Sequence, residues 1–403
     1  MRLLDAVLRK GLPLEAALDV AARDLDRADD RGLAHAIAAE ALRRLTDLDA
    51  LIDSATAKPL PDDAKARFAL RIALVQALAL DTPPHAAIAT VLPLVDGGPR
   101  RLVHGVYGSL MRRGATLPDP PSLPPTVVAR WEQAWGADIV QAAASASAVP
   151  PALDLFYASD PPDIEGRSLM PGHLRVERGT AVAGLTGFGE GGWWVQDISA
   201  SIPARLLGAG TGRSVLDLCA APGGKTMQLA AAGFAVTAVE ASESRLARLR
   251  ENLDRTRLQA RTIAADVMKW TPDAPADAIL LDAPCSATGI YRRHPDVLHR
   301  VRAGKIRELA EGQKAMLARA ADWVRPGGTL VYSVCSLEPE EGEAVVEQFL
   351  ASRPDFAIVP IAPAEVAAGM QPGDAGLLRI LPGTLAEQGG ADGFFVARLA
   401  RSG

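Results

Sequence analysis

The first part of the chain repeats its apolar residues at spacings of three and four. The repeats occur in the segments LLDAVL, LAHAIAAEALRRL, DLDALI, ARFALRIALVQALAL and RRLVHGVYGSLMRR. Side chains at these spacings share one face of an α-helix, so each segment predicts a helix that packs on a core. No alternating strand pattern interrupts them. Residues 1–118 are therefore predicted to form an all-α domain.

A proline-rich stretch, LPDPPSLPP at residues 117–125, ends this helical pattern. Proline restricts the residue before it and cannot continue a helix, so we interpret the stretch as a linker. A helical pattern, WEQAWGADIVQAAASASA, and the mixed segment VPPALDLFYAS follow it. Residues 119–190 are therefore predicted to be a linker and a small α+β connector.

Short apolar runs alternate with amphipathic helical patterns in the rest of the chain. The runs are SVLDLC, AVTAVE, RTIAAD, DAILLD, TLVYSVC, FAIVP and GFFVARLA. This alternation is typical of βαβ units, in which helices cover both faces of a parallel sheet. Residues 191–403 are predicted to form a doubly wound α/β domain of the Rossmann-like type. Ligands of such domains bind beyond the carboxyl ends of the strands.

Composition limits the class of protein. Of the 403 residues, 48% are hydrophobic and 23% are charged, a globular balance that suits a multidomain chain. The longest apolar stretch, around Ile72–Leu80, is far shorter than the roughly 20 residues that span a bilayer. The N-terminus mixes charges among its apolar residues, unlike a secretory signal. We expect a cytoplasmic protein without membrane segments, and a monomer.

The three cysteines and the net charge narrow the chemistry. Cys219, Cys285 and Cys335 lie far apart, without the paired spacing of a zinc site or the density of a disulfide scaffold. We therefore expect no metal and a reducing compartment that keeps the thiols available. The net charge of −5 means that any RNA binding must depend on local basic patches.

The first predicted strand leads into a loop of small residues. In SVLDLCAAPGGKT, Asp217 lies near the strand end and a glycine-rich turn precedes the helix KTMQLAAA. Small residues let a ligand approach the backbone, and the N–H groups of a helix start favour an anionic group. The segment predicts a cofactor cradle. A phosphate-binding P-loop is the alternative, although Cys219 stands where the first glycine of that motif is required and G-x-G-x-x-G is absent.

Acidic residues close the next two predicted strands. Glu240 ends the second run, where doubly wound folds place a carboxylate on a ribose diol. Taken alone, it is equally explained as part of the start of the helix SESRLARLRENL. Asp266 closes the third run, where a polar group can bind an adenine.

Two cysteines follow the ends of later strands. DAILLDAPCSATG places Asp282 and Cys285 at the ligand edge, and TLVYSVCS places Cys335 there. A thiolate is a strong nucleophile, and carbon 5 of cytosine becomes reactive only after a nucleophile adds at carbon 6. Buried cysteines often pack simply as small apolar residues. The occurrence of both at strand ends favours chemistry.

These motifs together resemble a known family. CAAPGGKT, DAPCSATG with RRHPD, and YSVCSLEPEEGEAVVEQFL are similar to the Sun/Fmu (RsmB-type) family of RNA (cytosine-5)-methyltransferases. The segments DRGLAHAIAAEALRRLTDLDALI and TPPHAAIATVLPLV resemble the NusB-like all-α domain fused to those enzymes. The resemblance covers nearly the whole chain.

The resemblance implies an activity and a role for each matching residue. The expected reaction is S-adenosylmethionine-dependent methylation of cytosine carbon 5 in RNA, most readily 16S ribosomal RNA, with Cys335 as nucleophile and Cys285 assisting product release. Asp282 also lies where a carboxylate can meet the cytosine edge. The expected cofactor-binding residues are Cys219, Ala220, Ala221, Pro222, Gly223, Gly224, Lys225, Glu240, Asp266 and Asp282.

The sequence departs from the family pattern at several positions. Val334 replaces the usual Thr before the nucleophile, Glu240 replaces Asp, and Gly342 replaces Asn. LDLFYAS near residue 153 replaces a segment that usually carries an Arg and an Asn. These departures leave the contacts of the connector, and the choice of target site, open.

Candidate RNA contacts come from basic residues. Arg292, Arg293 and His294 follow the Pro-Cys loop and are expected to bind phosphates beside the target base, although a solvated basic turn explains them equally well. Short basic pairs in the helical domain could bind RNA or protein; they comprise Arg43, Arg44, Arg100, Arg101, Arg112 and Arg113.

Three other functions remain open at this point. Transfer RNA is an alternative substrate, and in a DNA-type mechanism Cys285 would attack instead of Cys335. A non-catalytic RNA-binding assembly factor is the third. An adenine amino methyltransferase is disfavoured, because Asp282-Ala283-Pro284-Cys285 is not the Asp/Asn-Pro-Pro-aromatic loop of that chemistry.

Overall fold

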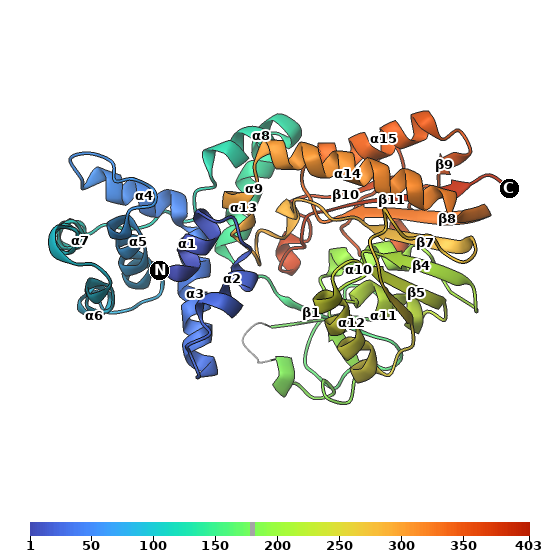
Figure 1. Ribbon diagram of the computed structural model, residues 1–403, viewed down its shortest axis with the longest axis horizontal. Helices are drawn as coiled ribbons and strands as arrows, with labels where there is room; N and C mark the ends of the chain where they lie inside the picture. The colour runs from blue at the N-terminus through green and yellow to red at the C-terminus, as the bar shows by residue number, and fades with distance from the viewer. Residues whose placement is uncertain (178–181) are drawn as a thin grey trace. The chain divides into compact units, whose positions relative to one another are not determined.

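The computed structural model describes residues 1–177 and 182–403. The chain forms two compact units, each described here by itself (Figure 1). Unit 1 comprises Met1–Val149 and Tyr291–Val301, and unit 2 comprises Pro150–Ile290 and Arg302–Gly403.

Unit 1 is all-α. Every helix expected from the apolar spacing is present, and α2, α6 and α13 are additional. The helices are α1 (Arg2–Leu8), α2 (Leu14–Ala21), α3 (Ala28–Arg43), α4 (Leu45–Ser54), α5 (Lys65–Ala79), α6 (Pro84–Val91), α7 (Gly97–Arg112), α8 (Pro125–Trp135), α9 (Ala137–Ala148) and α13 (Val297–Arg300). Helix α5 is central, since all its residues from Ala66 to Gln76 are buried. The Arg71 guanidinium on this helix donates to both carboxylate oxygens of Asp49 at 2.8 Å.

The boundaries of unit 1 differ from the predicted domain division. Helices α8 and α9, which we assigned to the connector, belong to unit 1. The proline-rich stretch also packs on this unit, because Ser122 N donates to Asp47 Oδ2 at 3.0 Å. Unit 1 further includes residues 291–301, which lie inside the predicted α/β domain in sequence.

Three contacts join residues 291–301 to α3, α8 and α9 of unit 1. The Arg43 guanidinium donates to the carbonyl of Arg292 at 3.2 Å and to that of Ser147 at 2.9 Å. The Tyr291 hydroxyl donates to the carbonyl of Ala143 at 3.1 Å, and its ring lies 5.5 Å from that of Trp131.

Unit 2 begins with a small antiparallel sheet of order β2-β1-β3. Its strands are β1 (Leu153–Tyr157), β2 (His173–Val176) and β3 (Trp193–Val195). The segment LDLFYAS supplies β1. Asp154 in this strand receives both prongs of the Arg175 guanidinium, at 2.6 and 2.8 Å, and the amide of Ile198 at 3.0 Å. Asp154 therefore joins the small sheet to the start of α10 (Ile198–Arg205).

The large sheet of unit 2 has the order β10-β11-β8-β7-β4-β5-β6, and β9 pairs with β11. The strands are β4 (Ser214–Leu218), β5 (Ala235–Glu240), β6 (Arg261–Ala264), β7 (Ala276–Asp282), β8 (Val324–Val334), β9 (Phe356–Ile358), β10 (Leu378–Ile380) and β11 (Phe394–Arg401). Strands β4 to β8 pair in parallel, as predicted. The sheet is mixed, because β11 runs antiparallel to β8, β9 and β10.

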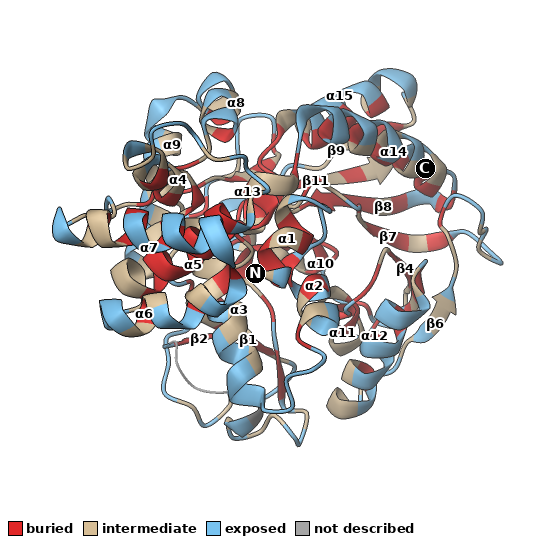
Figure 2. Cartoon of the chain, turned by 60° about the vertical axis from the view of Figure 1, so that its left-hand side comes forward, coloured by how far each residue is buried: buried red, intermediate tan, exposed pale blue. Residues whose placement is uncertain are grey.

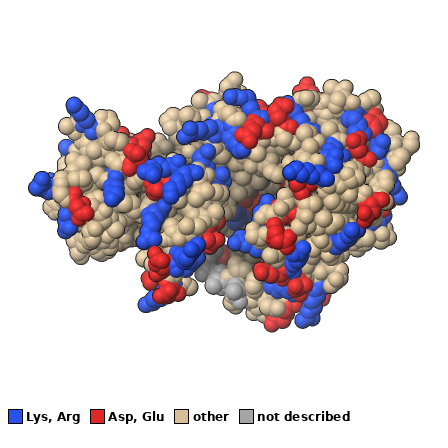
Figure 3. All heavy atoms as spheres, in the orientation of Figure 1, with Lys and Arg blue, Asp and Glu red and all other residues tan. Residues whose placement is uncertain are grey.

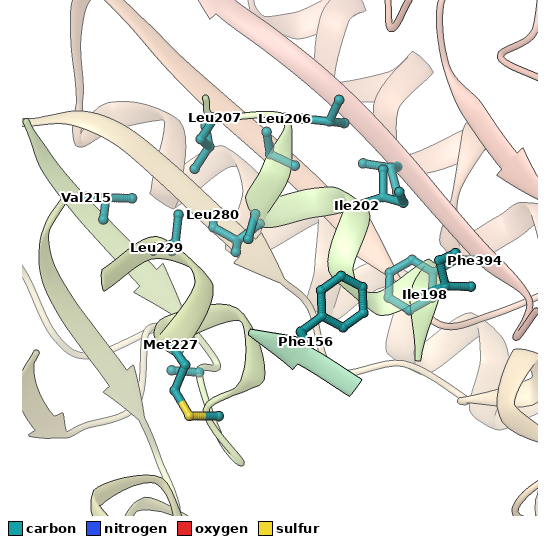
Figure 4. Close-up of a cluster of buried hydrophobic side chains, with 14 of the residues drawn as sticks. Phe156, Ile198, Ile202, Leu206, Leu207, Val215, Met227, Leu229, Leu280 and Phe394 are labelled. Atoms are coloured by element: carbon teal, nitrogen blue, oxygen red, sulfur yellow. The ribbon is translucent and has the colours of Figure 1, made fainter. Parts of the chain in front are cut away.

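Helices cover both faces of the large sheet. Helices α10, α11 (Gly224–Ala231) and α12 (Glu243–Thr256) lie on one face, and α14 (Ala303–Asp322) and α15 (Glu343–Ser352) on the other (Figure 1). Side chains alternate between the faces, so Leu280 joins the α10–α12 core (Figure 4) whereas Ile279 and Leu281 join the α14–α15 core. Figure 2 shows β7 and β8 largely buried, with α14 and α15 exposed along their outer sides. The Rossmann-like fold prediction is confirmed.

No helix in the described residues is long and apolar enough to cross a membrane. Across the same residues, no group of three or more His, Cys, Asp or Glu side chains is placed to hold a metal ion. Basic and acidic side chains are interspersed on the face shown in Figure 3.

Candidate active site

A cleft of about 430 Å³ lies at the carboxyl ends of β4 and β7. It brings together most of the predicted cofactor residues, since the loop after β4 and Asp282 line it. The sequence did not single out its remaining walls, which come from the small sheet, α10, α11 and α12. These walls include Phe188, Trp194, Gln196, Asn252 and Arg255.

The loop after β4 has a backbone that only small residues fit. Cys219 takes a left-handed conformation with φ of 62°, and Gly223 has φ of 107°. A Cβ on Gly223 would lie 3.0 Å from Leu249 Cγ, and one on Gly224 would lie 3.2 Å from Gln196 Cδ. Helix α11 begins at Gly224 and presents its first N–H groups at the cleft. Burial raises the pKa of Cys219 to about 12, so this cysteine stays a thiol.

Asp217 lies beneath this loop and is fully buried. Thr226 Oγ1 donates to its Oδ2 at 2.5 Å, while Oδ1 has no hydrogen-bond partner in the described part of the chain. Burial raises the pKa of Asp217 to about 7, although the Thr226 hydrogen bond opposes the rise. Asp217 is among the residues that line the cleft.

Glu240 and Asp266 close their strands as the sequence indicated, but neither lines the cleft. Glu240 is 3% exposed and receives the amides of Ser242 at 3.0 Å and Ala221 at 3.4 Å. Arg245 pairs with it at 3.3 Å and also donates to the carbonyl of Ala221 at 2.6 Å. Asp266 Oδ1 accepts from the amide of Met268 at 2.9 Å, and its side chain is 43% exposed. Glu240 therefore stabilises the loop, whether or not it also binds a ribose.

Lys225 and Asp282 form an ion pair across the cleft. Lys225 Nζ lies 2.7 Å from Asp282 Oδ2, and Ser333 Oγ donates to Asp282 Oδ1 at 2.8 Å. Burial disfavours the ammonium, but the Asp282 carboxylate outweighs it, so the pKa of Lys225 is raised. Lys225 also lies 5.3 Å above the ring of Phe394.

The two predicted catalytic cysteines meet. Cys285 Sγ and Cys335 Sγ are 3.5 Å apart, and no disulfide joins them. The hydrogen bond to Cys335, followed by burial, raises the pKa of Cys285 well above its usual range. The two sulfurs lie within hydrogen-bond distance, and either of them can be the donor.

The departures from the family pattern have a local explanation. Val334 faces the α14–α15 core, while its neighbour Ser333 faces Asp282. A side chain at Gly342 would collide with Arg379 and with the Phe395 ring. The Arg379 guanidinium pairs with Glu343, so it occupies the space that an asparagine side chain would need.

The predicted RNA-binding residues lie in the 291–301 segment of unit 1. Arg293 and His294 are partly exposed, and their binding to phosphates stays a prediction. Arg292 is only 4% exposed, and its binding to a phosphate likewise stays a prediction. Of the basic pairs in the helical domain, Arg43 and Arg44 bind carbonyls of unit 1 itself. The other four are exposed on and beside α7; they are Arg100, Arg101, Arg112 and Arg113.

Comparisons with known proteins agree with the fold. Residues 204–400 match the family "16S rRNA methyltransferase RsmB/F", and residues 1–97 match the NusB family. A ribosomal RNA small subunit methyltransferase B from Xylella fastidiosa is 35% identical, over 99% of this chain and 96% of that protein. The Erwinia tasmaniensis protein of the same name is 32% identical, over 99% and 96%.

Solved structures share the fold. A methyltransferase homologue from Pyrococcus horikoshii superimposes with a TM-score of 0.58 at 24% identity, over 73% of this chain and 98% of that one. The protein PH0851 superimposes with a TM-score of 0.74 at 24% identity, over 99% and 97%. This chain is therefore an S-adenosylmethionine-dependent RNA methyltransferase that belongs to the 16S rRNA methyltransferase RsmB/F family and carries an N-terminal NusB-family domain.

Proposed function

We propose that this enzyme methylates carbon 5 of a cytosine in small-subunit ribosomal RNA through a covalent bond to Cys335. One observation carries the proposal: two thiols lie 3.5 Å apart beside the Lys225–Asp282 ion pair, at the carboxyl ends of the adjacent strands β7 and β8. The names of the curated relatives supply the choice of RNA.

The cleft after β4 suits S-adenosylmethionine. The free Asp217 oxygen can accept from the ammonium of the amino-acid part, and the start of α11 favours its carboxylate. Ala220, Ala221 and Pro222 leave room for the chain of the ligand. Glu240 and Asp266, at the next two strand ends, would hold the ribose and the adenine. When bound, the cofactor supplies an electrophilic methyl group.

Cys335 is the better nucleophile of the two cysteines. Cys285 keeps its proton and donates to Cys335, and the Lys225 ammonium favours a negative charge on the same sulfur. The thiolate of Cys335 adds to carbon 6 of the base, which makes carbon 5 electron-rich enough to take the methyl group. Asp282 can accept from the exocyclic amino group or a protonated ring nitrogen as this charge develops.

Release of the product returns both cysteines to their starting state. A water molecule takes the proton from carbon 5, the electron pair of that C–H bond restores the 5,6 double bond, and the carbon 6–sulfur bond breaks to expel Cys335 Sγ as a thiolate. Cys285, still a thiol, can donate a hydrogen bond to the departing sulfur from its place beside it. Cys285 thereby assists the step that frees the methylated RNA.

Trapping separates the two cysteines. The full-length enzyme, S-adenosylmethionine and a small-subunit RNA transcript that contains 5-fluorocytosine should give a covalent complex whose peptide map shows the base on Cys335. Cys335→Ala should give neither complex nor methyl transfer, and Cys285→Ala should accumulate a complex with ordinary RNA. A base found on Cys285 would reverse the assignment.

A test of substrate uses the same enzyme. Bisulfite sequencing of transcripts of small-subunit RNA and of transfer RNA after incubation should find the new mark in the former. A mark only in transfer RNA would move the enzyme to that substrate, and no methyl transfer to any RNA would leave the assembly-factor alternative. A monomeric state and a cytoplasmic location stay predictions.

A further inference from the structure

A buried carboxylate joins the two loops that carry the cysteines. Glu341 lies at the end of a short 3-10 helix, Pro339–Glu341, and has no exposed surface. Neither its charge nor its position has a part in the chemistry above. A buried carboxylate is costly unless several donors satisfy it, so its partners show what it does.

Four donors meet the Glu341 carboxylate, and three of them come from residues next to a cysteine. The Ser286 amide donates to Oε1 at 2.8 Å, and the Ser286 hydroxyl donates to Oε2. The Ser336 hydroxyl donates to Oε2 at 2.5 Å. Ser286 follows Cys285 and Ser336 follows Cys335, so one side chain fixes the backbone beside both sulfurs.

The fourth donor extends the same arrangement to the other side of Cys285. Gln313 Nε2, on α14, donates to Glu341 Oε1 at 3.0 Å and to the carbonyl of Pro284 at 2.9 Å. Glu341 therefore holds Ser286 directly and Pro284 through Gln313, which are the residues on the two sides of Cys285. Gln313 is 1% exposed, so water does not compete for these bonds.

Direct contacts between the two loops show that they form one unit. The Gly289 amide donates to the carbonyl of Cys335 at 3.0 Å, and the Leu337 amide donates to Thr288 Oγ1 at 3.0 Å. The Ser286 and Ser336 hydroxyls lie 3.1 Å apart. These contacts between the two loops account for the 3.5 Å separation of the sulfurs. Among the side chains that make them, Glu341 accepts the largest number of hydrogen bonds.

We infer that Glu341 is a positioning residue, which holds the Cys285 and Cys335 loops at the separation that lets one thiol donate to the other. The inference rests on the proposed function for its effect on turnover, but the geometry itself is open to a separate measurement. The hydrogen bonds, rather than the negative charge, carry the role. A glutamine can also satisfy all four partners, because its oxygen accepts from two N–H groups and its amide donates to two hydroxyls that turn to accept.

The experiment compares Glu341→Ala, Glu341→Gln and Glu340→Gln in the full-length enzyme. Glu340 is the matched control, because it lies in the same 3-10 helix but is exposed. Two quantities are measured: kcat and KM for methyl transfer, and the effective concentration of Cys285 toward Cys335 from disulfide formation in glutathione buffers. In that exchange the pair gives up two protons and two electrons as oxidised glutathione becomes two thiols.

The expected pattern is specific to positioning. E341A should lower kcat about 100-fold, because a displacement of about 1 Å costs that much, with KM for S-adenosylmethionine unchanged. The effective concentration of the thiols should fall roughly tenfold or more as the preorganised pair loosens. E341Q should recover most of both quantities, and E340Q should match the wild type.

Several results would overturn the inference. A folded E341A enzyme with the wild-type effective thiol concentration would show that Glu341 does not hold the loops, whether or not the wild type methylates RNA. E341Q that is as impaired as E341A would show that charge, not hydrogen bonding, matters. If E341A does not fold, Ser286→Ala with Ser336→Ala removes the hydroxyl bonds and keeps the carboxylate, and unchanged thiol geometry in that variant would refute the role.

Discussion

Burial of Asp217 makes the stability of the fold depend on pH in a direction that can be measured. An aspartate in an unfolded chain ionises near pH 4, whereas burial raises the pKa of Asp217 to about 7. Between these values the unfolded chain releases a proton that the folded chain keeps. Stability is thus lost as pH rises through this window, by about 1.4 kcal/mol per pH unit and about 4 kcal/mol in total at pH 7.

Asp217→Asn removes this titration and keeps an oxygen that can accept from Thr226. The variant should match the wild type near pH 4 and exceed its free energy of unfolding by about 4 kcal/mol at pH 7. Asp277→Asn is a control of opposite sign. Hydrogen bonds from the Ser214 hydroxyl and amide, at 2.8 and 2.7 Å, lower the pKa of Asp277, so its carboxylate stabilises the fold at neutral pH.

Urea unfolding followed by tryptophan fluorescence, on ligand-free protein, measures both variants at several pH values. The gain for D217N should increase by about 2 kcal/mol between about pH 5 and about pH 7. A gain that is constant over this range would show that Asp217 is ionised in the folded chain. Burial would then not control this carboxyl, and the reasoning would be refuted.

Three further predictions follow from single contacts. Lys225→Met should lower single-turnover methyl transfer about 100-fold by removing the ammonium beside Asp282; unchanged turnover would dismiss its role. Arg43→Ala should cost about 1–3 kcal/mol of stability, because it leaves the Arg292 carbonyl without its donor, and residues 291–301 should lose protection from hydrogen exchange. Asp154→Asn should cost about 3 kcal/mol in thermal unfolding by leaving the buried Arg175 guanidinium unbalanced; a cost below about 1 kcal/mol would contradict the pairing.

The sequence predicted the parallel strands because they are buried on both faces and therefore read as continuous apolar runs. It could not predict the direction of β11, since an apolar run is the same in both directions. The direction of β11 depends on the long connection between β8 and β11. This connection contains α15, and it brings β11 back beside β8 in the antiparallel direction. β10, which has three residues, Leu378–Ile380, was not predicted because so short a run has no readable period.

The sequence predicted which loops form the site, but it did not predict which side chains contact one another there. Strand ends placed Asp282, Cys285 and Cys335 at one edge, and the structure adds that the sulfurs are in contact. The bonds of Glu341 join residues 55 and 5 positions away in sequence, so no local pattern marks them. The burial of Arg292 could not be predicted either. A basic turn is expected to be exposed, but tertiary packing buries this side chain.

Residues 291–301 lie in unit 1, apart from the sequence segments on either side of them. Apolar periodicity assigns residues 291–301 to the α/β domain, because nothing in a sequence shows that a segment leaves one core for another. Tyr291, Val297 and Leu298 are nevertheless buried, and the side chains of Tyr291 and His299 form hydrogen bonds with the carbonyls of Ala143 and Leu42 in unit 1. A fragment that begins at residue 191 would lack the unit 1 partners of residues 291–301. This segment begins six residues after Cys285 in the chain. We therefore expect a fragment without residues 1–149 to leave residues 291–301 without their hydrogen-bond partners in α3 and α9.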